Sequence, residues 1–302
     1  MTSAVNIPTL AQTLIDAAIR EALSEDLGLA GDITTNATVA ADAKAEAVIA
    51  TRRDGVVSGL PLAEAAFRAL DPRITFEIHK PDGSAVKPGE TIATVSGNAR
   101  AILTAERVAL NFMGRMSGIA TLTRKYCDAV SGTNAKIADT RKTTPGLRAF
   151  EKYAVRCGGG QNHRSGLFDA ILIKDNHIVA SGGIEAAIKA AHIAAGHMLK
   201  IEVEVDTLEQ LDQVLKHKID AVLLDNMTPA QLKDAVKRVA GRCLTEASGG
   251  VNLDTVRAIA ESGVDMISVG ALTHSAAVLD LGLDFKPHAP FSNQATKRTL
   301  SA

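Results

Sequence analysis

The sequence predicts an α/β protein with two parts, a small N-terminal α+β domain followed by a barrel of repeated strand and helix units. From residue 136 onward, short β-rich runs alternate with helical segments, and the later runs start 21 to 30 residues apart. That spacing holds one strand plus one helix, so we expect parallel strands joined by right-handed crossovers. Ahead of residue 136, strands and helices are mixed without such a repeat, which is typical of an α+β domain.

The composition fits a folded enzyme and argues against several other classes. At roughly 150 residues per domain, 302 residues make two domains or one large domain with an appendage. A formal net charge of -1 and an aromatic content of 3% argue against nucleic-acid binding. No apolar run reaches the roughly 18 residues that span a bilayer, and residues 1–8 lack a signal-peptide pattern, so we expect a soluble, cytoplasmic protein. Three widely spaced cysteines favour neither a disulfide framework nor a zinc site.

In the N-terminal part, apolar residues at helical spacing predict a first helix over 10–27, which ends at Gly28. A long helical stretch over 101–130 connects the two parts, and Gly114 and Gly118 predict a break or kink in it. The elements between these helices are strands at 45–52, 74–79 and 91–95 and a helix at 61–70 that starts with proline.

Six β-rich runs predict the barrel strands, and a seventh strand without a clear pattern would also fit. The six runs are 136–139, 170–174, 200–205, 221–224, 244–247 and 266–269. A doubly wound open sheet is the alternative, but its dinucleotide-binding motif G-x-G-x-x-G is absent, as is the P-loop motif. Residues 287–302 contain two prolines and end in polar residues, so we expect a weakly ordered tail.

Charged residues or glycines follow nearly every predicted barrel strand, at the end where barrel enzymes build their active sites. Residues 136–177 hold eight Lys and Arg against four acids. This basic stretch predicts a polyanionic substrate, because Arg grips carboxylate or phosphate and Lys adds a compact charge. For Arg148, Lys152 and Arg156, which lie at helical spacing, a solvated helix face is an equal alternative. Anion binding is favoured for the strand-end residues, which are Arg141, Lys142 and Lys174.

Glu202, Glu204 and Asp206 alternate along one predicted strand, and Asp225 ends the next strand. Buried carboxylates are stable only when they are paired or bind a metal. We therefore expect them to meet the basic residues, a divalent cation or sugar hydroxyl groups, with a purely structural ion pair as the alternative for Glu202.

Glycine-rich turns come late in the predicted barrel, at Ser248, Gly249 and Gly250 and again at Gly270. Such turns ahead of a helix present backbone N–H groups that bind phosphate. The run Gly158–Gly160 predicts either a flexible active-site loop or a plain turn.

Taken in order, these motifs resemble the quinolinate phosphoribosyltransferases, the carboxylating nicotinate-nucleotide pyrophosphorylases. The resemblance extends from Gly31 to about Leu283. The matching segments are TAER at 104–107 with Asn111 and Phe112, ADTRKTTPGLR at 138–148, GGGQNHR at 158–164, IKDNH at 173–177, EVEV at 202–205, LDN at 224–226, EASGG at 246–250 and VGALTHS at 269–275.

The resemblance implies an N-terminal α/β sandwich domain over 1–115, completed by 276–286, and an incomplete, seven-stranded α/β barrel over 116–275. It also implies a homodimer with shared active sites, and it leaves open whether dimers assemble further. The family's reaction transfers a phosphoribosyl group from 5-phosphoribosyl 1-pyrophosphate to quinolinate. This reaction depends on Mg²⁺ and yields nicotinate mononucleotide, pyrophosphate and CO₂ for de novo NAD biosynthesis.

The resemblance further implies a role for each residue that matches a family motif. The catalytic residues would be Lys142, Glu204 and Asp225, and the last two would hold the ribose hydroxyl groups and the Mg²⁺-bound diphosphate. Quinolinate would be held by Arg141, His163, Arg164 and Lys174, with Lys142 between quinolinate and the pyrophosphate and Arg107 reaching in from the partner subunit. The 5-phosphate would bind Ser248, Gly249, Gly250 and Gly270, and the substrate-binding set is completed by Thr140 and Ser268.

Two other functions remain open on the sequence alone. One is a related enzyme that acts on nicotinate or on a phosphorylated sugar, although His163, Arg164 and Lys174 suit two carboxylates better than one. The other is a non-catalytic barrel that binds a phosphorylated ligand or a partner protein, which would leave Glu204 and Asp225 without a task.

Overall fold

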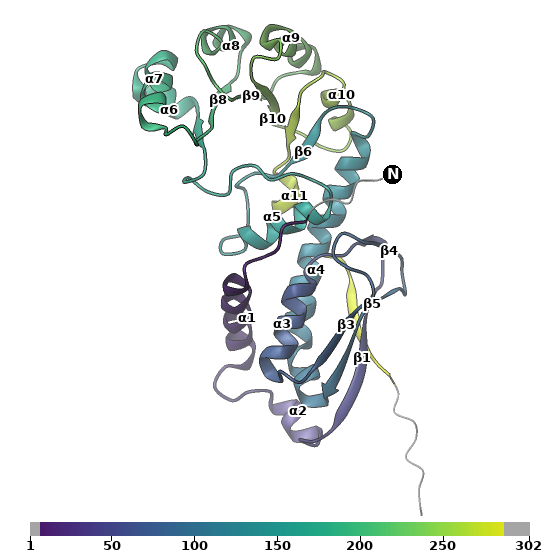
Figure 1. Ribbon diagram of the computed structural model, residues 1–302. Coiled ribbons are helices and arrows are strands. Elements are labelled where there is room, and N and C mark those ends of the chain that lie inside the picture. The colour runs from purple at the N-terminus through teal and green to yellow at the C-terminus, as the bar shows by residue number, and fades with distance from the viewer. Residues whose placement is uncertain (1–6, 287–302) are drawn as a thin grey trace, which may run out of the picture.

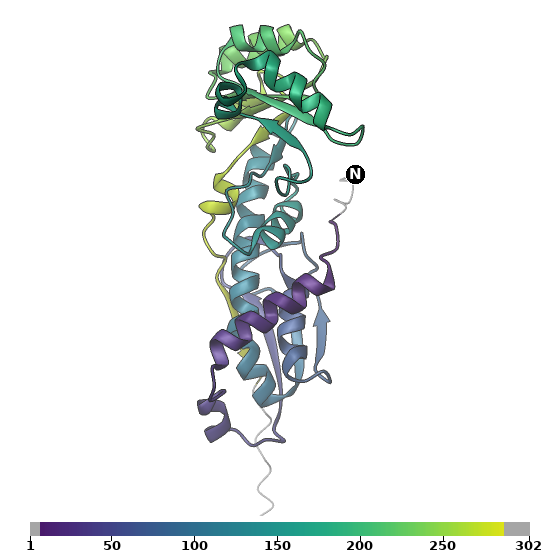
Figure 2. The same cartoon turned by 90° about the vertical axis from the view of Figure 1, so that its left-hand side faces the viewer.

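The structure is a computed structural model that describes residues 7–286, so the tail predicted at 287–302 lies outside the described residues. An antiparallel sheet with its helices forms one half of an elongated molecule, and a parallel sheet with its own helices forms the other (Figures 1 and 2). The helix α4 (Ala99–Ala129) runs from the first half into the second.

In the first half, four strands form an antiparallel sheet in the order β12-β1-β5-β3. Their bounds are Leu281–Phe285 for β12, Lys44–Thr51 for β1, Thr91–Asn98 for β5 and Thr75–Ile78 for β3. Alternate residues of β1, Ala47 and Ile49, are fully buried because side chains of a strand point to opposite faces in turn. The buried face packs against α4 and α3 (Leu60–Leu70), with α1 (Gln12–Leu27) beside α3. The strands and helices predicted for this part are confirmed.

The remaining elements of this half are short. α2 (Ile33–Thr38) begins at Asp32, whose carboxylate accepts a hydrogen bond from Thr35 N. β2 (Gly55–Val56) pairs with β4 (Ala85–Val86) in a separate antiparallel ribbon. The strand β12 joins the sheet of the first half although it follows the barrel in the chain.

The glycines of the long helix predict a break or kink. The break is wrong, because α4 continues without interruption for 31 residues. Gly114 and Gly118 are needed for close packing instead. A Cβ atom on Gly118 would lie 2.0 Å from the carbonyl oxygen of Ala277, and one on Gly114 would lie 3.1 Å from that of Leu279. These glycines therefore let the segment before β12 cross the helix at backbone distance.

In the second half, six parallel strands form a curved sheet in the order β6-β11-β10-β9-β8-β7, as the six sequence runs predict. At the open edge, Gln161 forms an isolated parallel bridge with Ala138 of β6. This bridge occupies the place of a seventh strand, which is reduced to a single residue pair in the described chain. The strand bounds are Lys136–Ala138 for β6, Ile171–Ile173 for β7, Ile201–Val205 for β8, Ala221–Asp225 for β9, Leu244–Ser248 for β10 and Met266–Ser268 for β11.

Helices connect these strands and cover the outside of the sheet (Figure 1). α8 and α9 each begin with a capping box, in which a threonine side chain accepts a backbone N–H and a glutamine reaches back to the threonine N–H. Among the described residues, no helix has the length and apolar character needed to span a membrane. The helices are α5 (Arg148–Cys157), α6 (Asp175–Ser181), α7 (Ile184–Ala194), α8 (Leu208–Val214), α9 (Pro229–Val239), α10 (Val256–Ala260) and α11 (Ala271–His274).

Candidate active site

The carboxyl ends of the parallel strands surround a cavity of about 670 Å³. Thirteen of the fourteen residues predicted to bind substrate line it, because parallel strands bring their carboxyl ends to one edge. They are Thr140, Arg141, Lys142, His163, Arg164, Lys174, Glu204, Asp225, Ser248, Gly249, Gly250, Ser268 and Gly270.

Arg107 is the fourteenth residue and lies elsewhere. It is exposed on α4, and it does not line the cavity of its own chain. Its predicted role therefore depends on a second subunit.

Two guanidinium groups, Arg141 and Arg164, line the cavity with unused hydrogen-bonding capacity. The Nε atoms of both are buried and have no hydrogen-bond partner among the described residues. Burial and the neighbouring charge of Arg141 lower the pKa of Arg164 from its ordinary value. Two neighbouring guanidinium groups with partnerless Nε atoms favour an anionic ligand, since each is a planar fork that matches a carboxylate.

A buried ion pair holds the loop that carries His163 and Arg164. Lys152 Nζ lies 2.5 Å from Asp139 Oδ1 and donates to His163 O at 2.9 Å. Asp139 also accepts from His163 N at 2.8 Å and from Asn162 Nδ2 at 2.7 Å. Lys152 is 5% exposed and Asp139 is fully buried, so Lys152 positions the loop rather than presenting a charge to solvent.

The other two basic residues of α5 are structural as well. Arg148 Nε donates to Thr143 Oγ1 at 2.9 Å, and Arg156 donates to the carbonyl oxygen of Gly160. The alternative of a purely solvated face is therefore wrong. None of the three residues lines the cavity, and anion binding by Arg148 and Arg156 stays a prediction. The Gly158–Gly160 run packs tightly, since a Cβ on Gly158 would lie 2.5 Å from Ala120 O of α4, which favours the plain turn.

The carboxylates at the cavity come from neighbouring strands. Glu204 of β8 forms an ion pair with Lys174, and Asp225 of β9 accepts a hydrogen bond from Asn226 Nδ2 at 2.6 Å. Asp206 is exposed beyond the end of β8, so the predicted alternation of three acids stops at Glu204. Two carboxylates that face one cavity supply the hard oxygen ligands that suit Mg²⁺.

The turn after β10 brings backbone close to the cavity. Gly249 has φ of +91°, and a Cβ there would lie 2.1 Å from Asn226 Oδ1. Gly250 has φ of +61°, another left-handed conformation that favours glycine. At Gly270, a Cβ would lie 3.1 Å from Lys142 Cδ, so this glycine leaves room for the lysine side chain.

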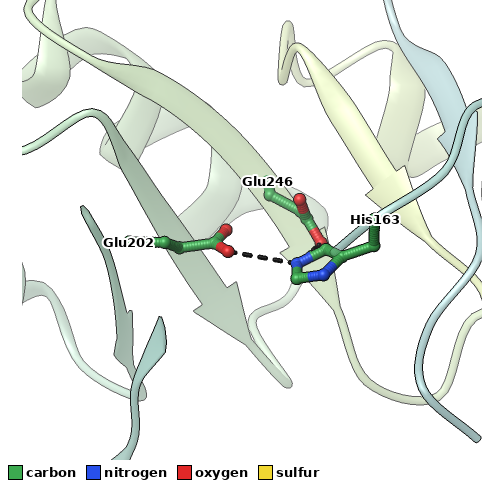
Figure 3. Close-up of side chains that lie close together, drawn as sticks. All are labelled: His163, Glu202 and Glu246. Atoms are coloured by element: carbon green, nitrogen blue, oxygen red, sulfur yellow. Dashed lines mark hydrogen bonds and ion pairs between the residues drawn. The ribbon is translucent and has the colours of Figure 1, made fainter. Parts of the chain in front are cut away.

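Below these residues, His163 lies between two buried glutamates, Glu202 of β8 and Glu246 of β10 (Figure 3). His163 Nε2 is 3.1 Å from Glu202 Oε2 and 3.5 Å from Glu246 Oε1. Burial and the negative charge of Glu202 raise the pKa of Glu246 to about 7. Burial lowers the pKa of His163, but the two glutamates outweigh it and raise the value overall.

Sequence reasoning missed part of the cavity lining. Glu246 and Asn226 stood within the quoted motifs but received no role. The strand-end rule that found Asp225 applies to Asn226, which follows it, but not to Glu246, which lies in the middle of β10. No periodicity or spacing marks the remaining lining residues, which are Leu172, Leu223, Val251, Val269, Ala271 and His274.

The chain matches models of both domains of one protein family. The model described as the N-terminal domain of quinolinate phosphoribosyl transferase matches residues 32–117, and the C-terminal domain model matches residues 119–284. Curated relatives agree with this match. The chain is 48% identical over 273 residues to a nicotinate-nucleotide pyrophosphorylase (carboxylating) of Mycobacterium leprae, which covers 88% of this chain and 95% of the relative. It is 45% identical over 260 residues to a probable enzyme of the same name from Bacillus subtilis, which covers 86% and 89%.

Solved structures agree with the fold over nearly the whole chain. The nicotinate-nucleotide pyrophosphorylase from Ehrlichia chaffeensis superposes with a TM-score of 0.87 at 42% identity, covering 92% of this chain and 100% of that one. The enzyme of that name from Francisella tularensis gives a TM-score of 0.86 at 40% identity, covering 93% and 99%. Both domain models, the curated relatives and the solved structures thus agree, and the chain belongs to the quinolinate phosphoribosyl transferase family.

Proposed function

We propose that this cavity transfers the phosphoribosyl group of 5-phosphoribosyl 1-pyrophosphate to quinolinate and removes one carboxylate, which yields nicotinate mononucleotide, pyrophosphate and CO₂ for NAD biosynthesis. The observation that carries the proposal is the pair Arg141 and Arg164, whose buried Nε atoms have no partner among the described residues. With His163 and Lys174 on the same wall, they form a basic site that suits a dicarboxylate.

The chain's own residues bind and orient the two substrates. Arg141, Arg164 and Lys174 neutralise the carboxylates of quinolinate, and with His163, which lines the cavity beside Arg164, they aim its ring nitrogen at the anomeric carbon. Lys142 lies between that site and Gly270 and stabilises the leaving pyrophosphate. As the bond to pyrophosphate breaks, the new bond from the ring nitrogen to carbon forms.

The carboxylates on β8 and β9 serve the sugar. Glu204 and Asp225 accept hydrogen bonds from ribose hydroxyl groups and favour the positive charge that develops at the anomeric carbon. The 5-phosphate is held by backbone N–H groups and by the hydroxyl groups of Ser248 and Ser268, and Gly249, Gly250 and Gly270 keep the backbone accessible there. Thr140 lies beside Lys142, whose backbone N–H donates to the Thr140 hydroxyl group.

Mg²⁺ is the cofactor in this proposal. The two carboxylates of Glu204 and Asp225 fit it, because Mg²⁺ binds proteins through one or two carboxylates and takes its other ligands from water and substrate phosphates. When bound, Mg²⁺ would neutralise the charge of the diphosphate and stabilise its departure.

The proposed assembly is a homodimer in which Arg107 of one subunit completes the cavity of the other. Mixing Arg107→Ala with Lys142→Ala chains tests it, because a mixed dimer keeps one intact site. Random mixing of two inactive variants should restore about a quarter of the wild-type activity. Recovery of no activity would show that Arg107 acts within its own chain, and an Arg107→Ala variant that is active by itself would show that Arg107 has no role. The cytoplasmic location is likewise a proposal, tested by fractionating cells that make the protein.

Equilibrium binding tests the substrate assignment. Calorimetric titration with quinolinate and with nicotinate should show at least about tenfold tighter binding of quinolinate, since the second carboxylate gains a charged hydrogen bond. Arg164→Ala should remove most of this difference. Equal affinity for both acids would instead favour an enzyme that acts on nicotinate.

A further inference from the structure

The buried glutamate Glu246 has no part in the functions described above. Its side chain lines the cavity, the residue is only 4% exposed, and its Oε1 atom lacks a hydrogen-bond partner among the described residues. Glu202 and His163 are its closest ionisable neighbours (Figure 3). His163 Nε2 lies 3.5 Å from Glu246 Oε1, but two buried glutamates share that one ring, which is costly, so the cluster needs a cation or a proton.

The hydrogen bonds of His163 favour a proton over a metal ion. His163 Nδ1 accepts the backbone N–H of Arg164 at 2.8 Å, so Nδ1 carries the lone pair and Nε2 carries the hydrogen. That hydrogen points to Glu202 at 3.1 Å, so Nε2 has no lone pair to offer a metal. The two glutamates favour a protonated His163 ring and so raise its pKa. A second proton would have to bind Nδ1, however, and this would break the hydrogen bond that Nδ1 accepts from Arg164 N. The extra proton therefore belongs on a carboxyl group.

Glu246 is the carboxyl group that holds it. Burial and the charge of Glu202 raise the pKa of Glu246 to about 7, whereas no hydrogen bond of the described residues reaches its Oε1 atom. The groups that face it from the surrounding elements are Glu202 on β8, His163 on the loop before β7, Ser268 on β11, and Asp139 after β6 with its partner Lys152.

The proposed reaction requires a proton at this place. After transfer, the ring nitrogen is positively charged and draws electrons from the neighbouring carbon. When the bond from that carbon to the carboxylate breaks, CO₂ leaves and the electron pair stays on the ring carbon. The carbon must then take up one proton before nicotinate mononucleotide can leave.

We propose that Glu246 is the general acid that delivers this proton to the ring carbon. The O–H bond of Glu246 breaks, a C–H bond forms, and Glu246 is left as a carboxylate that water reprotonates after product release. This inference rests on the proposed function, since it concerns the second half of the same reaction. It assigns phosphoribosyl transfer and decarboxylation to different groups in one cavity.

Rapid quenching of the Glu246→Gln enzyme with quinolinate and 5-phosphoribosyl 1-pyrophosphate tests the proposal. We expect a first turnover of pyrophosphate within about threefold of wild type, while nicotinate mononucleotide forms at least about 100-fold more slowly. When no proton arrives, the electron pair on the ring carbon recaptures CO₂, so the undecarboxylated nucleotide should accumulate to about one equivalent per site. Glu261→Gln is the matched control, because it makes the same change at an exposed residue of the same half.

Two outcomes would overturn the inference, and a third would overturn the function on which it rests. Wild-type formation of nicotinate mononucleotide by Glu246→Gln would exclude Glu246 as the acid. An equal loss of pyrophosphate and nicotinate mononucleotide would assign it a structural role. Failure of the wild-type enzyme to release pyrophosphate with quinolinate would instead refute the proposed function itself.

A pH profile gives an independent test that does not require the Glu246 variant to fold. Glu246 must be protonated to donate, so product formation should be present below its pKa and fall as the pH rises through about 7. Glu202→Gln removes a negative neighbour that, together with burial, raises this pKa, so the falling limb should move to lower pH. An unchanged limb in Glu202→Gln would contradict the assignment.

Discussion

Replacing Lys152 by methionine should destabilise the barrel and weaken quinolinate binding together. The ammonium group is buried against Asp139 at 2.5 Å and also donates to His163 O at 2.9 Å. Burial raises the pKa of the Asp139 carboxyl group, and Lys152 is the largest of the influences that lower it. Without Lys152, a fully buried carboxylate loses its main partner.

The magnitude follows from breaking a buried pair by removing one partner, which costs about 3–5 kcal/mol. For a domain of this size each kcal/mol lowers Tm by about 2–4 °C, so Lys152→Met should unfold about 6–20 °C lower. His163 O also loses a charged donor, which should raise the Kd for quinolinate about tenfold or more.

Thermal unfolding followed by circular dichroism, with calorimetric titration of quinolinate, measures both effects. Lys233→Met on the exposed face of α9 is the matched control. The double variant Asp139→Asn with Lys152→Met should lose less stability than the sum of the single variants, because it leaves no unpaired charge. A Tm within about 2 °C of the control, or strict additivity, would refute the reasoning.

Three further changes probe other parts of the molecule. Gly118→Ala should lower stability by about 1–3 kcal/mol in thermal unfolding, because the new methyl group would lie 2.0 Å from Ala277 O; an unchanged Tm would contradict this packing. Tyr153→Phe removes the hydroxyl group that donates to Asp82 Oδ2 at 2.7 Å and should cost about 1–3 kcal/mol, which denaturant titration would detect. Lys142→Ala should keep the wild-type Tm but lose at least about 100-fold in pyrophosphate release, and full activity would remove Lys142 from the site.

The sequence predicts the barrel strands and most of the cavity for one physical reason. Parallel strands place their carboxyl ends at the same edge, so Lys174 and Asp225 can be brought together without knowing any long-range contact. The match to family motifs then adds roles for residues such as Arg164 that no spacing rule distinguishes.

What sequence reasoning misses depends on partners that are far apart in the chain. Helical spacing does not separate a solvated lysine from Lys152, whose partner Asp139 precedes the helix. Gly118 produces the same local pattern whether the helix bends or another segment crosses it, and only Ala277, more than 150 residues later, decides between them. Likewise, the pKa of Glu246 is raised because the fold buries its carboxyl group and the sheet brings Glu202 beside it.

The measurement that tests the central claim most directly is the stoichiometry of a single reaction mixture. The enzyme is incubated with 5-phosphoribosyl 1-pyrophosphate, Mg²⁺ and quinolinate labelled in its 2-carboxylate, and pyrophosphate, CO₂ and nicotinate mononucleotide are counted. We expect equal amounts of all three products, no CO₂ when Mg²⁺ is removed, and no turnover when nicotinate replaces quinolinate. Pyrophosphate release with nicotinate alone, or binding of quinolinate without any pyrophosphate, would contradict the account.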